Sequence, residues 1–130
     1  MQTLSLVVEK SQGRFWGKVK YDGAVLTDID KTVEGLERRL RSQLHRYFSL
    51  KSDGVAFVRH YDLTALFVRF HYLKIQAIAE RSGIDAEQLR QYAAGLSYPT
   101  IAEAKKVEKA LHDIGRELIA TSVVAQADLL

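Results

Sequence analysis

The sequence predicts an α+β fold, in which a small β-β-β-α-β unit precedes an all-α unit. In the first part of the chain, short apolar and polar alternations are separated by turn dipeptides, which is typical of strands. In the second part, apolar residues recur at helical spacing after capping residues. Strands and helices segregated in this way favour the α+β class. We therefore predict one domain over residues 1–60 and a second over residues 61–130.

The composition is that of a globular protein. The 130 residues fit one ordinary domain or two small ones, and 47% of them are hydrophobic, so a core is possible. No apolar run approaches the roughly 20 residues of a membrane span, and no basic stretch precedes the first short apolar run as in a signal peptide. Cysteine is absent, which excludes disulfides and agrees with a reducing cytoplasm, where we expect the protein.

Three strands are expected before the first helix. Alternation over Leu4–Glu9 predicts the first strand, and Ser11–Gly13 the turn after it. Arg14–Tyr21 alternates again. The dipeptide Asp22-Gly23 favours a two-residue hairpin turn, since its type I′ geometry needs positive φ at both centres. Ala24–Ile29 is then the third strand of a meander.

A helix over Val33–Phe48 follows, with Asp30 or Thr32 as its cap, and Val55–His60 is the fourth strand. So small a sheet has exposed edges, and we expect oligomerisation or partner binding there. The apolar stripe of the helix is Val33, Leu36, Leu40, Leu44 and either Tyr47 or Phe48.

The other face of this helix is basic. A solvated face is the favoured interpretation, and a surface for an acidic partner or RNA is the alternative. RNA is the weaker alternative because no aromatic platform accompanies the arginines. The basic residues are Arg38, Arg39, Arg41 and Arg46, with only Glu34 and Glu37 nearby.

The segment Lys74–Gly95, which follows a short helix capped by Asp62, predicts a helix-turn-helix. Ala79 lets a second helix approach closely, and Gly83, four residues on, makes the sharp turn. Leu89, ten residues after Ala79, fills the angle between the helices. A helical hairpin of a small α-domain is the alternative interpretation.

The second helix of this motif has a good N-terminal capping residue, and the first helix does not. Asp85 can cap the second helix, and Gln88 is placed to complete a capping box. Lys74 stands where a capping side chain is expected for the first helix. Lys74 and Gln76 are expected to contact phosphates and so fix the register on a duplex.

One side of the second motif helix faces outward in such a pair, and in helix-turn-helix proteins this side enters the major groove. Arg90 suits guanine and Gln91 suits adenine. Ala86 could touch a thymine methyl group, and Glu87 could accept from cytosine or repel phosphate. The outward residues are Asp85, Ala86, Glu87, Arg90, Gln91 and Ala94. The predicted DNA-binding residues are Lys74, Gln76, Asp85, Ala86, Glu87, Arg90 and Gln91.

A long helix closes the chain. Thr100 and Glu103 form a capping box at its start, and it runs to about Ile119. The residues of Ala120–Leu130 are either an arm that docks on a partner subunit or a frayed tail. The stripe expected to be buried is Ile101, Ala104, Val107, Leu111, Ile114 and Leu118.

The charge distribution opposes DNA binding by the second unit. Residues 1–60 carry 11 Lys/Arg and 7 Asp/Glu, whereas residues 61–130 carry 8 and 9. Phosphate neutralisation supplies most non-specific affinity, so local clustering or a multimer must provide the attraction. The competing hypothesis is a protein-interaction module with a vestigial helix-turn-helix.

We expect no enzyme activity, metal site or cofactor. Asp22, Asp28 and Asp30 could mimic the carboxylates of a two-metal nuclease, but turn and capping roles explain them better. The sequence has no phosphate-binding glycine loop and no nucleophile elbow. Nor do the histidines have zinc-ligand spacing; they are His45, His60, His71 and His112.

Five segments of the chain carry a resemblance to a known family: VVEKSQGRFWGKV (Val7–Val19), TVEGLERRL (Thr32–Leu40), YDLTALF (Tyr61–Phe67), AERSGIDAEQLRQYAAG (Ala79–Gly95) and KKVEKALHDIGRELI (Lys105–Ile119). With these segments, nearly the whole chain resembles HicB-type antitoxins, most closely the form common in Bacteroidetes-like genomes. The resemblance implies a partial RNase H-like N-terminal domain that blocks a HicA-like, mRNA-cleaving toxin. It also implies a C-terminal domain that binds the operon's own operator DNA as a homodimer or higher oligomer. Many such antitoxins have a Pro-Gly-Cys loop where this chain has Tyr21–Ala24.

Overall fold

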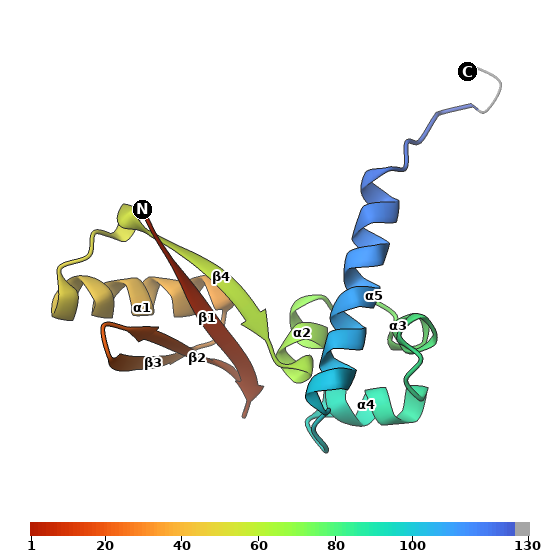
Figure 1. Cartoon of the computed structure of the whole chain (residues 1–130), viewed down its shortest axis with the longest axis horizontal. Coiled ribbons are helices and arrows are strands. Elements are labelled where there is room, and N and C mark those ends of the chain that lie inside the picture. The colour runs from red at the N-terminus through yellow and green to blue at the C-terminus, as the bar shows by residue number, and fades with distance from the viewer. Residues whose placement is uncertain (127–130) are drawn as a thin grey trace.

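The computed structural model describes residues 1–126, in which a four-stranded sheet comes first and the helices α2 to α5 follow it (Figure 1). The predicted α+β class is confirmed. Residues 127–130, the end of the predicted arm or tail, lie outside the described residues. In chain order the elements are β1 (Gln2–Ser11), β2 (Arg14–Tyr21), β3 (Ala24–Asp30), α1 (Val33–Phe48), the 3₁₀ turn η1 (Ser52–Gly54), β4 (Val55–Tyr61), α2 (Leu63–Arg69), α3 (Ile75–Ser82), α4 (Ala86–Ala94) and α5 (Ile101–Ile119).

The sheet is mixed, with the order β3-β2-β1-β4. Two tight hairpins make β1, β2 and β3 antiparallel, whereas β4 returns parallel to β1 after the α1 crossover. Both centres of each hairpin turn have positive φ, at Gln12-Gly13 and at Asp22-Gly23, as type I′ turns require. The predicted hairpin at Asp22-Gly23 is therefore confirmed.

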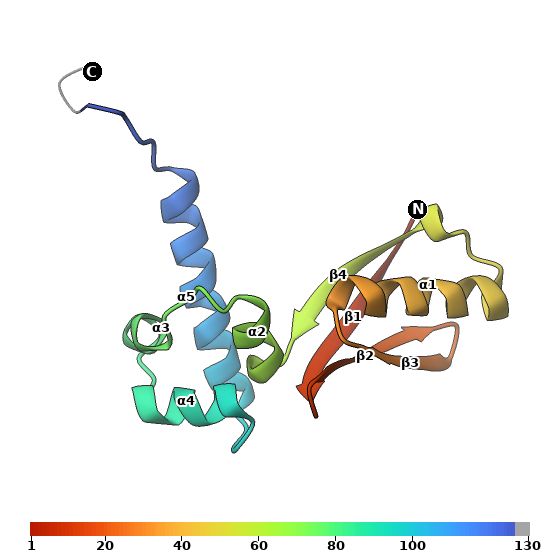
Figure 2. The same ribbon diagram turned by 180° about the vertical axis from the view of Figure 1, so that it is seen from behind.

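Helix α1 lies across one face of the sheet and closes the first core (Figure 2). Leu36, Leu40 and Leu44 are fully buried against the strands. The helix approaches β2 closely at Gly17, where a Cβ atom would lie 2.8 Å from the Leu36 side chain. Of the two predicted caps the structure selects Thr32, whose hydroxyl accepts a hydrogen bond from the Gly35 N–H.

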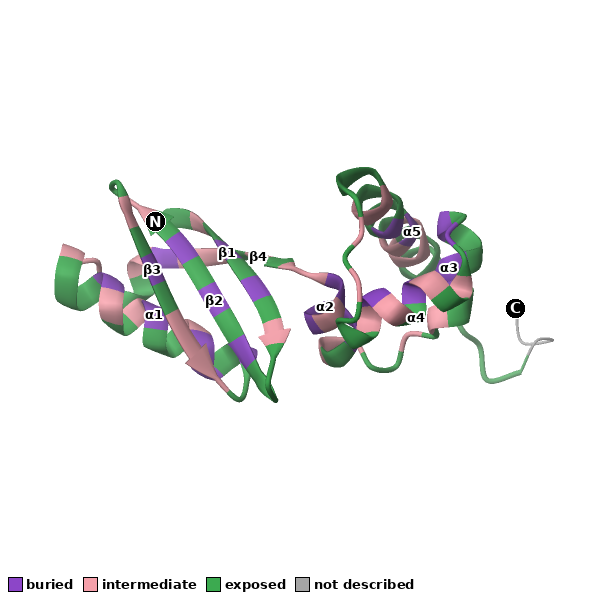
Figure 3. Cartoon of the chain, turned by 90° about the horizontal axis from the view of Figure 1, so that it is seen from below, coloured by how far each residue is buried: buried purple, intermediate pink, exposed green. Residues whose placement is uncertain are grey.

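The opposite face of the sheet is uncovered within residues 1–126. Buried and exposed residues alternate along β2, because one side meets α1 and the other meets solvent (Figure 3). Four large apolar side chains on the solvent side are exposed. They are Val7, Trp16, Val25 and Val58.

The helices α2 to α5 surround a second core. The two cores meet at α2, since Ala65 belongs to the first cluster and Leu63, Leu66 and Phe67 belong to the second. Tyr61, at the end of β4, packs against both clusters. The domain boundary between residues 60 and 61 stays a prediction. No helix in residues 1–126 combines the length and apolarity needed to cross a membrane.

The predicted buried stripe of α5 is right in its middle, where Leu111 and Ile114 pack against the helical core beside Val107, and wrong at its two ends. Only Val107 and Ala110 of this helix are buried, while Ile101 is 84% exposed and Leu118 is 67% exposed. For Leu118 the physical reason is visible in Figure 1, where the C-terminal half of α5 projects beyond the other helices, whereas Ile101 is the first residue of α5 and precedes the part that packs on the core. An apolar face of α5 therefore remains without a partner in the described chain.

Because the residue that caps α2 is a partly buried carboxyl, we predict that the stability of the protein depends on pH. Asp62 accepts a hydrogen bond of 2.7 Å from the Ala65 N–H, and burial raises the pKa of its carboxyl. Asp62→Ala should lower the free energy of unfolding by about 1 kcal/mol through loss of the cap. Asp62→Asn keeps the cap and removes a charge that the fold disfavours, so it should equal or exceed wild type at neutral pH.

Any advantage of Asp62→Asn should shrink as the pH falls. Protonation of the wild-type carboxyl at its raised pKa removes the penalty of burying its charge. Chemical denaturation of the three proteins at neutral and acid pH measures this. An advantage that grows with acidification would contradict the assignment.

Candidate nucleic-acid interface

The turn between α3 and α4 is built as the sequence predicts. Gly83 has φ of 72°, the left-handed conformation that favours glycine, and ends α3. The Ala79 carbonyl accepts hydrogen bonds from the N–H groups of Gly83 and Ile84, so the chain reverses within one turn. Ile84 is buried beneath the turn.

Small and wedge residues hold the two helices together. Ala79 is buried where the helices approach, and Leu89 is 0% exposed between them. Ser82 is also buried, and its hydroxyl donates to the Ile78 carbonyl at 2.7 Å, so it leaves no unpaired polar group. The predicted roles of Ala79, Gly83 and Leu89 in packing and turning are thus confirmed.

The predicted capping box of α4 is wrong in one half. Asp85 does cap the helix, accepting a hydrogen bond from the Gln88 N–H at 3.1 Å. The Gln88 side chain instead donates to the Ser97 hydroxyl at 3.3 Å, across the loop after α4. Lys74 makes no side-chain cap on α3, as its residue type predicts.

The outward face of α4 is only partly open. Asp85, Glu87 and Arg90 are exposed, whereas Gln91 is half-buried. Ala86 is also half-buried and packs against the helical core, which limits its access to a thymine methyl group. The exposed end of this surface is therefore polar and charged.

The structure brings Arg90 together with two other predicted site residues. Its guanidinium donates to Gln76 Oε1 at 3.1 Å, from the start of α3, and lies 3.3 Å from Glu87 Oε2. The Gln76 amide donates in turn to Glu80. The Lys74 side chain is exposed and makes no hydrogen bond or ion pair within residues 1–126, while its carbonyl accepts from the Ile78 N–H.

These contacts orient the Arg90 side chain but leave its guanidinium able to bind another partner. An exposed ion pair contributes about 0–1 kcal/mol, which is less than a bidentate bond to guanine offers in discrimination, about 1–3 kcal/mol. The guanidinium has five N–H donors, and its contacts with Gln76 and Glu87 leave others free. Arg90 can therefore exchange Glu87 for a base edge at small cost.

Acidic side chains surround the α3–α4 pair, in agreement with the low net charge of residues 61–130. Glu80, Asp85 and Glu87 are exposed on or beside the outward face. Arg81 is engaged elsewhere, in a two-bond contact with Glu117 of α5 that lowers the pKa of that carboxyl. A single copy of the motif therefore offers little net attraction to phosphates.

Sequence reasoning missed a contact that ties α4 to α5. The Tyr92 hydroxyl donates to both carboxylate oxygens of Glu103 at 3.0 Å. The Thr100 N–H also donates to Glu103, and this hydrogen bond is the main cause that lowers the pKa of the Glu103 carboxyl. The predicted capping box of Thr100 and Glu103 is confirmed. The contact of Glu103 with Tyr92 could not be predicted from the sequence, because it leaves no periodic pattern there.

The carboxylates considered for metal binding have other partners. Asp30 accepts hydrogen bonds from Thr32 and Arg39, and the Thr32 N–H is the main cause that lowers the pKa of its carboxyl. Asp28 accepts from the Gln43 amide at 2.9 Å. Within residues 1–126, no three His, Asp or Glu side chains cluster in a way that could hold a metal ion.

The structure is that of a small α+β protein in which a tight turn at Gly83 joins α3 to α4. No protein-family model, curated protein or solved structure matches the chain.

Proposed function

We propose that the protein is a HicB-like antitoxin and transcriptional autorepressor. Its helix-turn-helix binds operator DNA, and residues 1–60, as a partial RNase H-like domain, bind a HicA-like mRNA-cleaving toxin. It works in the cytoplasm as a homodimer or higher oligomer, and it has no enzymatic role of its own. The single observation that carries the proposal is the packing of α3 against α4, in which the turn at Gly83 and the buried Leu89 hold α4 with Arg90 exposed.

In this proposal α4 enters the major groove of the operator. Arg90 releases Glu87 and pairs with guanine, while Gln91 pairs with adenine. Gln76, which already contacts Arg90 at 3.1 Å, turns with Lys74 toward the phosphates at the groove's edge. Glu87 restricts docking by repelling phosphates, which favours one register over its neighbours.

Replacing Arg90 tests this assignment. Arg90→Ala should weaken operator binding by about 1–3 kcal/mol and relax specificity at one base pair of each half-site. Gel-shift titrations with duplexes from the region upstream of the gene, and with single-base variants of the bound duplex, measure both effects.

The matched control is Arg14→Ala, which removes the same charge from an exposed position on β2, far along the chain from the motif. It should lower the affinity equally for all duplexes, and only slightly. Unchanged affinity and unchanged base preference in Arg90→Ala would reject the role of Arg90.

The oligomer that we propose forms through α5. Leu118 is 67% and Ile119 is 88% exposed at the projecting end of this helix, and Val123 just beyond it is also exposed. A second copy packed there would cover these apolar side chains. Dimers of helix-turn-helix proteins place two recognition helices on half-sites about 34 Å apart. Two weakly charged motifs would then act together on one operator.

The toxin-binding part of the proposal rests on the uncovered side of the sheet. Val7, Trp16 and Val58 form exposed apolar positions on neighbouring strands, and β3 and β4 are free edges within the described chain. Such edges pair readily with another chain. A short reading frame for a small basic protein beside this gene would support a toxin partner.

A protein-interaction module with a vestigial helix-turn-helix is the second candidate. The engagement of Arg90 by Glu87, and the acidic residues Glu80 and Asp85 nearby, favour it. This candidate predicts no duplex binding, or binding that does not respond to salt. The repressor predicts affinity that falls steeply as salt rises, because phosphate contacts release counterions. Titrations at several salt concentrations separate the two.

A further inference from the structure

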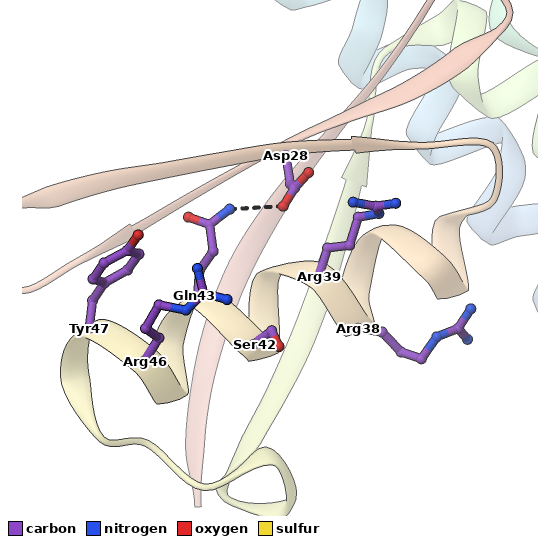
Figure 4. Close-up of a pocket in the computed structure, with 7 residues that line it drawn as sticks. All are labelled: Asp28, Arg38, Arg39, Ser42, Gln43, Arg46 and Tyr47. Atoms are coloured by element: carbon purple, nitrogen blue, oxygen red, sulfur yellow. Dashed lines mark hydrogen bonds between the residues drawn. The ribbon is translucent and has the colours of Figure 1, made fainter.

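A basic cleft of about 610 Å³ lies between α1 and β3, far along the chain from the helix-turn-helix (Figure 4). Arg38, Arg39 and Arg46 line it from the helix, and Asp28 lines it from the strand. The proposed antitoxin function assigns this cleft no role. Three arginines against one carboxylate give it a positive balance, so an anionic ligand is complementary to it.

Two of the three arginines have no counter-charge. Arg39 is paired with Asp30 at 3.0 Å through its Nε, which leaves its terminal amino groups free. Arg38 and Arg46 form no ion pair with any carboxylate in residues 1–126, and both are exposed. Eight residues of helix separate them, on the order of 12 Å along the axis. This separation suits a polymer with several phosphates better than a single nucleotide.

An aromatic platform stands beside these arginines, so the expectation that they have none is wrong. Tyr47 is 62% exposed, and the Arg46 guanidinium lies 5.8 Å from its ring centroid. Phe48 took the core position instead, packing edge-on against Tyr21 at 5.1 Å between ring centroids. Exposed Tyr and Arg planes are the surfaces on which unpaired bases stack.

The carboxylate of Asp28 adds a hydrogen-bond acceptor between α1 and the strand. One of its oxygens accepts from the Gln43 amide at 2.9 Å, as Figure 4 shows, and the other accepts from the Ile29 N–H at 2.8 Å. Carboxylate oxygens have further lone pairs, and acidic side chains in nucleotide sites accept from ribose hydroxyls. An acidic peptide could bind the arginines through its charge, but it offers no base to stack on Tyr47 and no ribose hydroxyl for Asp28.

We propose that this cleft binds single-stranded RNA. Arg38 and Arg46 hold successive phosphates, a base stacks on Tyr47, and Asp28 accepts a hydrogen bond from a ribose 2′-hydroxyl. The site is separate from α4, so Arg90→Ala retains RNA binding and each activity can fail without the other.

The test is fluorescence anisotropy of the full chain with a fluorescein-labelled oligouridine of twelve nucleotides. The double variant Arg38→Glu/Arg46→Glu should lose at least tenfold in affinity, because two phosphate contacts become repulsive. Tyr47→Ala should lose about tenfold, the effect of one stacked base. The matched control Lys18→Glu/Lys20→Glu makes the same charge change on β2 and should stay within about twofold of wild type. Circular dichroism confirms that each variant is folded.

Two further ligands define the specificity. An oligodeoxyuridine of equal length should bind about two- to tenfold more weakly, since it lacks the 2′-hydroxyl bond to Asp28. A labelled oligoglutamate should bind more weakly than oligouridine, because it has charge but no base or ribose hydroxyl. The proposal is overturned if oligouridine does not bind, if the two charge-reversal pairs lose affinity equally, or if Tyr47→Ala binds as wild type. Equal binding of the deoxy form, or tighter binding of oligoglutamate, also overturns it.

Discussion

Leu89→Ala is expected to lower the free energy of unfolding of the helical core by about 2–5 kcal/mol. Leu89 is fully buried in the angle between α3 and α4, among Ile78, Ala79 and Tyr92. Truncation removes buried methyl groups and leaves a cavity that the two helices can close only by changing their angle. Because the same angle presents Arg90, the variant should also lose operator affinity at temperatures where it is still folded.

The control for this prediction is Leu96→Ala. Leu96 is exposed in the loop after α4, so the same chemical change should alter stability by no more than about 0.5 kcal/mol. Urea denaturation followed by far-ultraviolet circular dichroism gives both values. Equal stabilities of the two variants would show that Leu89 does not hold the motif together.

The double variant Leu118→Asp/Ile119→Asp is expected to be monomeric and to lose operator affinity by about 10²- to 10⁴-fold. Both side chains are exposed in the single chain, so the change should leave its folding intact. In the proposed dimer they are covered, and burying unpaired carboxylates there is unfavourable. Loss of the dimer then removes the second half-site contact, which in this account is the main source of affinity.

Sedimentation velocity and gel-shift titration measure this prediction together. The control Val25→Asp/Val58→Asp adds the same charge at exposed apolar positions of the sheet and should affect neither α5 pairing nor operator binding. Wild type that sediments as a monomer would contradict α5 pairing. A monomeric double variant that binds the operator as tightly as wild type would contradict the role of the dimer.

The features that the sequence predicts correctly are those set by neighbouring residues. Asp22-Gly23 specifies its turn because few residue pairs accept positive φ at both centres. Asp62, Asp85 and Thr100 specify helix starts, because a short polar side chain can reach an N–H three residues ahead. The packing and the turn between α3 and α4 belong to the same group, since Ala79, Gly83 and Leu89 lie within eleven residues.

The features that sequence reasoning missed depend on what packs against each face. Helical spacing marks Leu118 as apolar, but it cannot show that α5 extends past its neighbours. Spacing also left Tyr47 and Phe48 equivalent, and only the contact with Tyr21 decides that Phe48 is inside. The contact between Arg90 and Gln76 spans fourteen residues and follows from the helix–helix angle, which spacing indicates only in outline.

The most direct test of the account is a selection of bound duplexes from a random library, performed with wild type, Arg90→Ala and Gln91→Ala. The account predicts that wild type enriches a two-fold symmetric sequence whose half-site centres lie about one helical turn apart. Each variant should lose base preference at one symmetric pair of positions and keep the rest. Failure of wild type to enrich any sequence, or enrichment of the same sequence by all three proteins, would contradict the proposal that α4 recognises operator DNA.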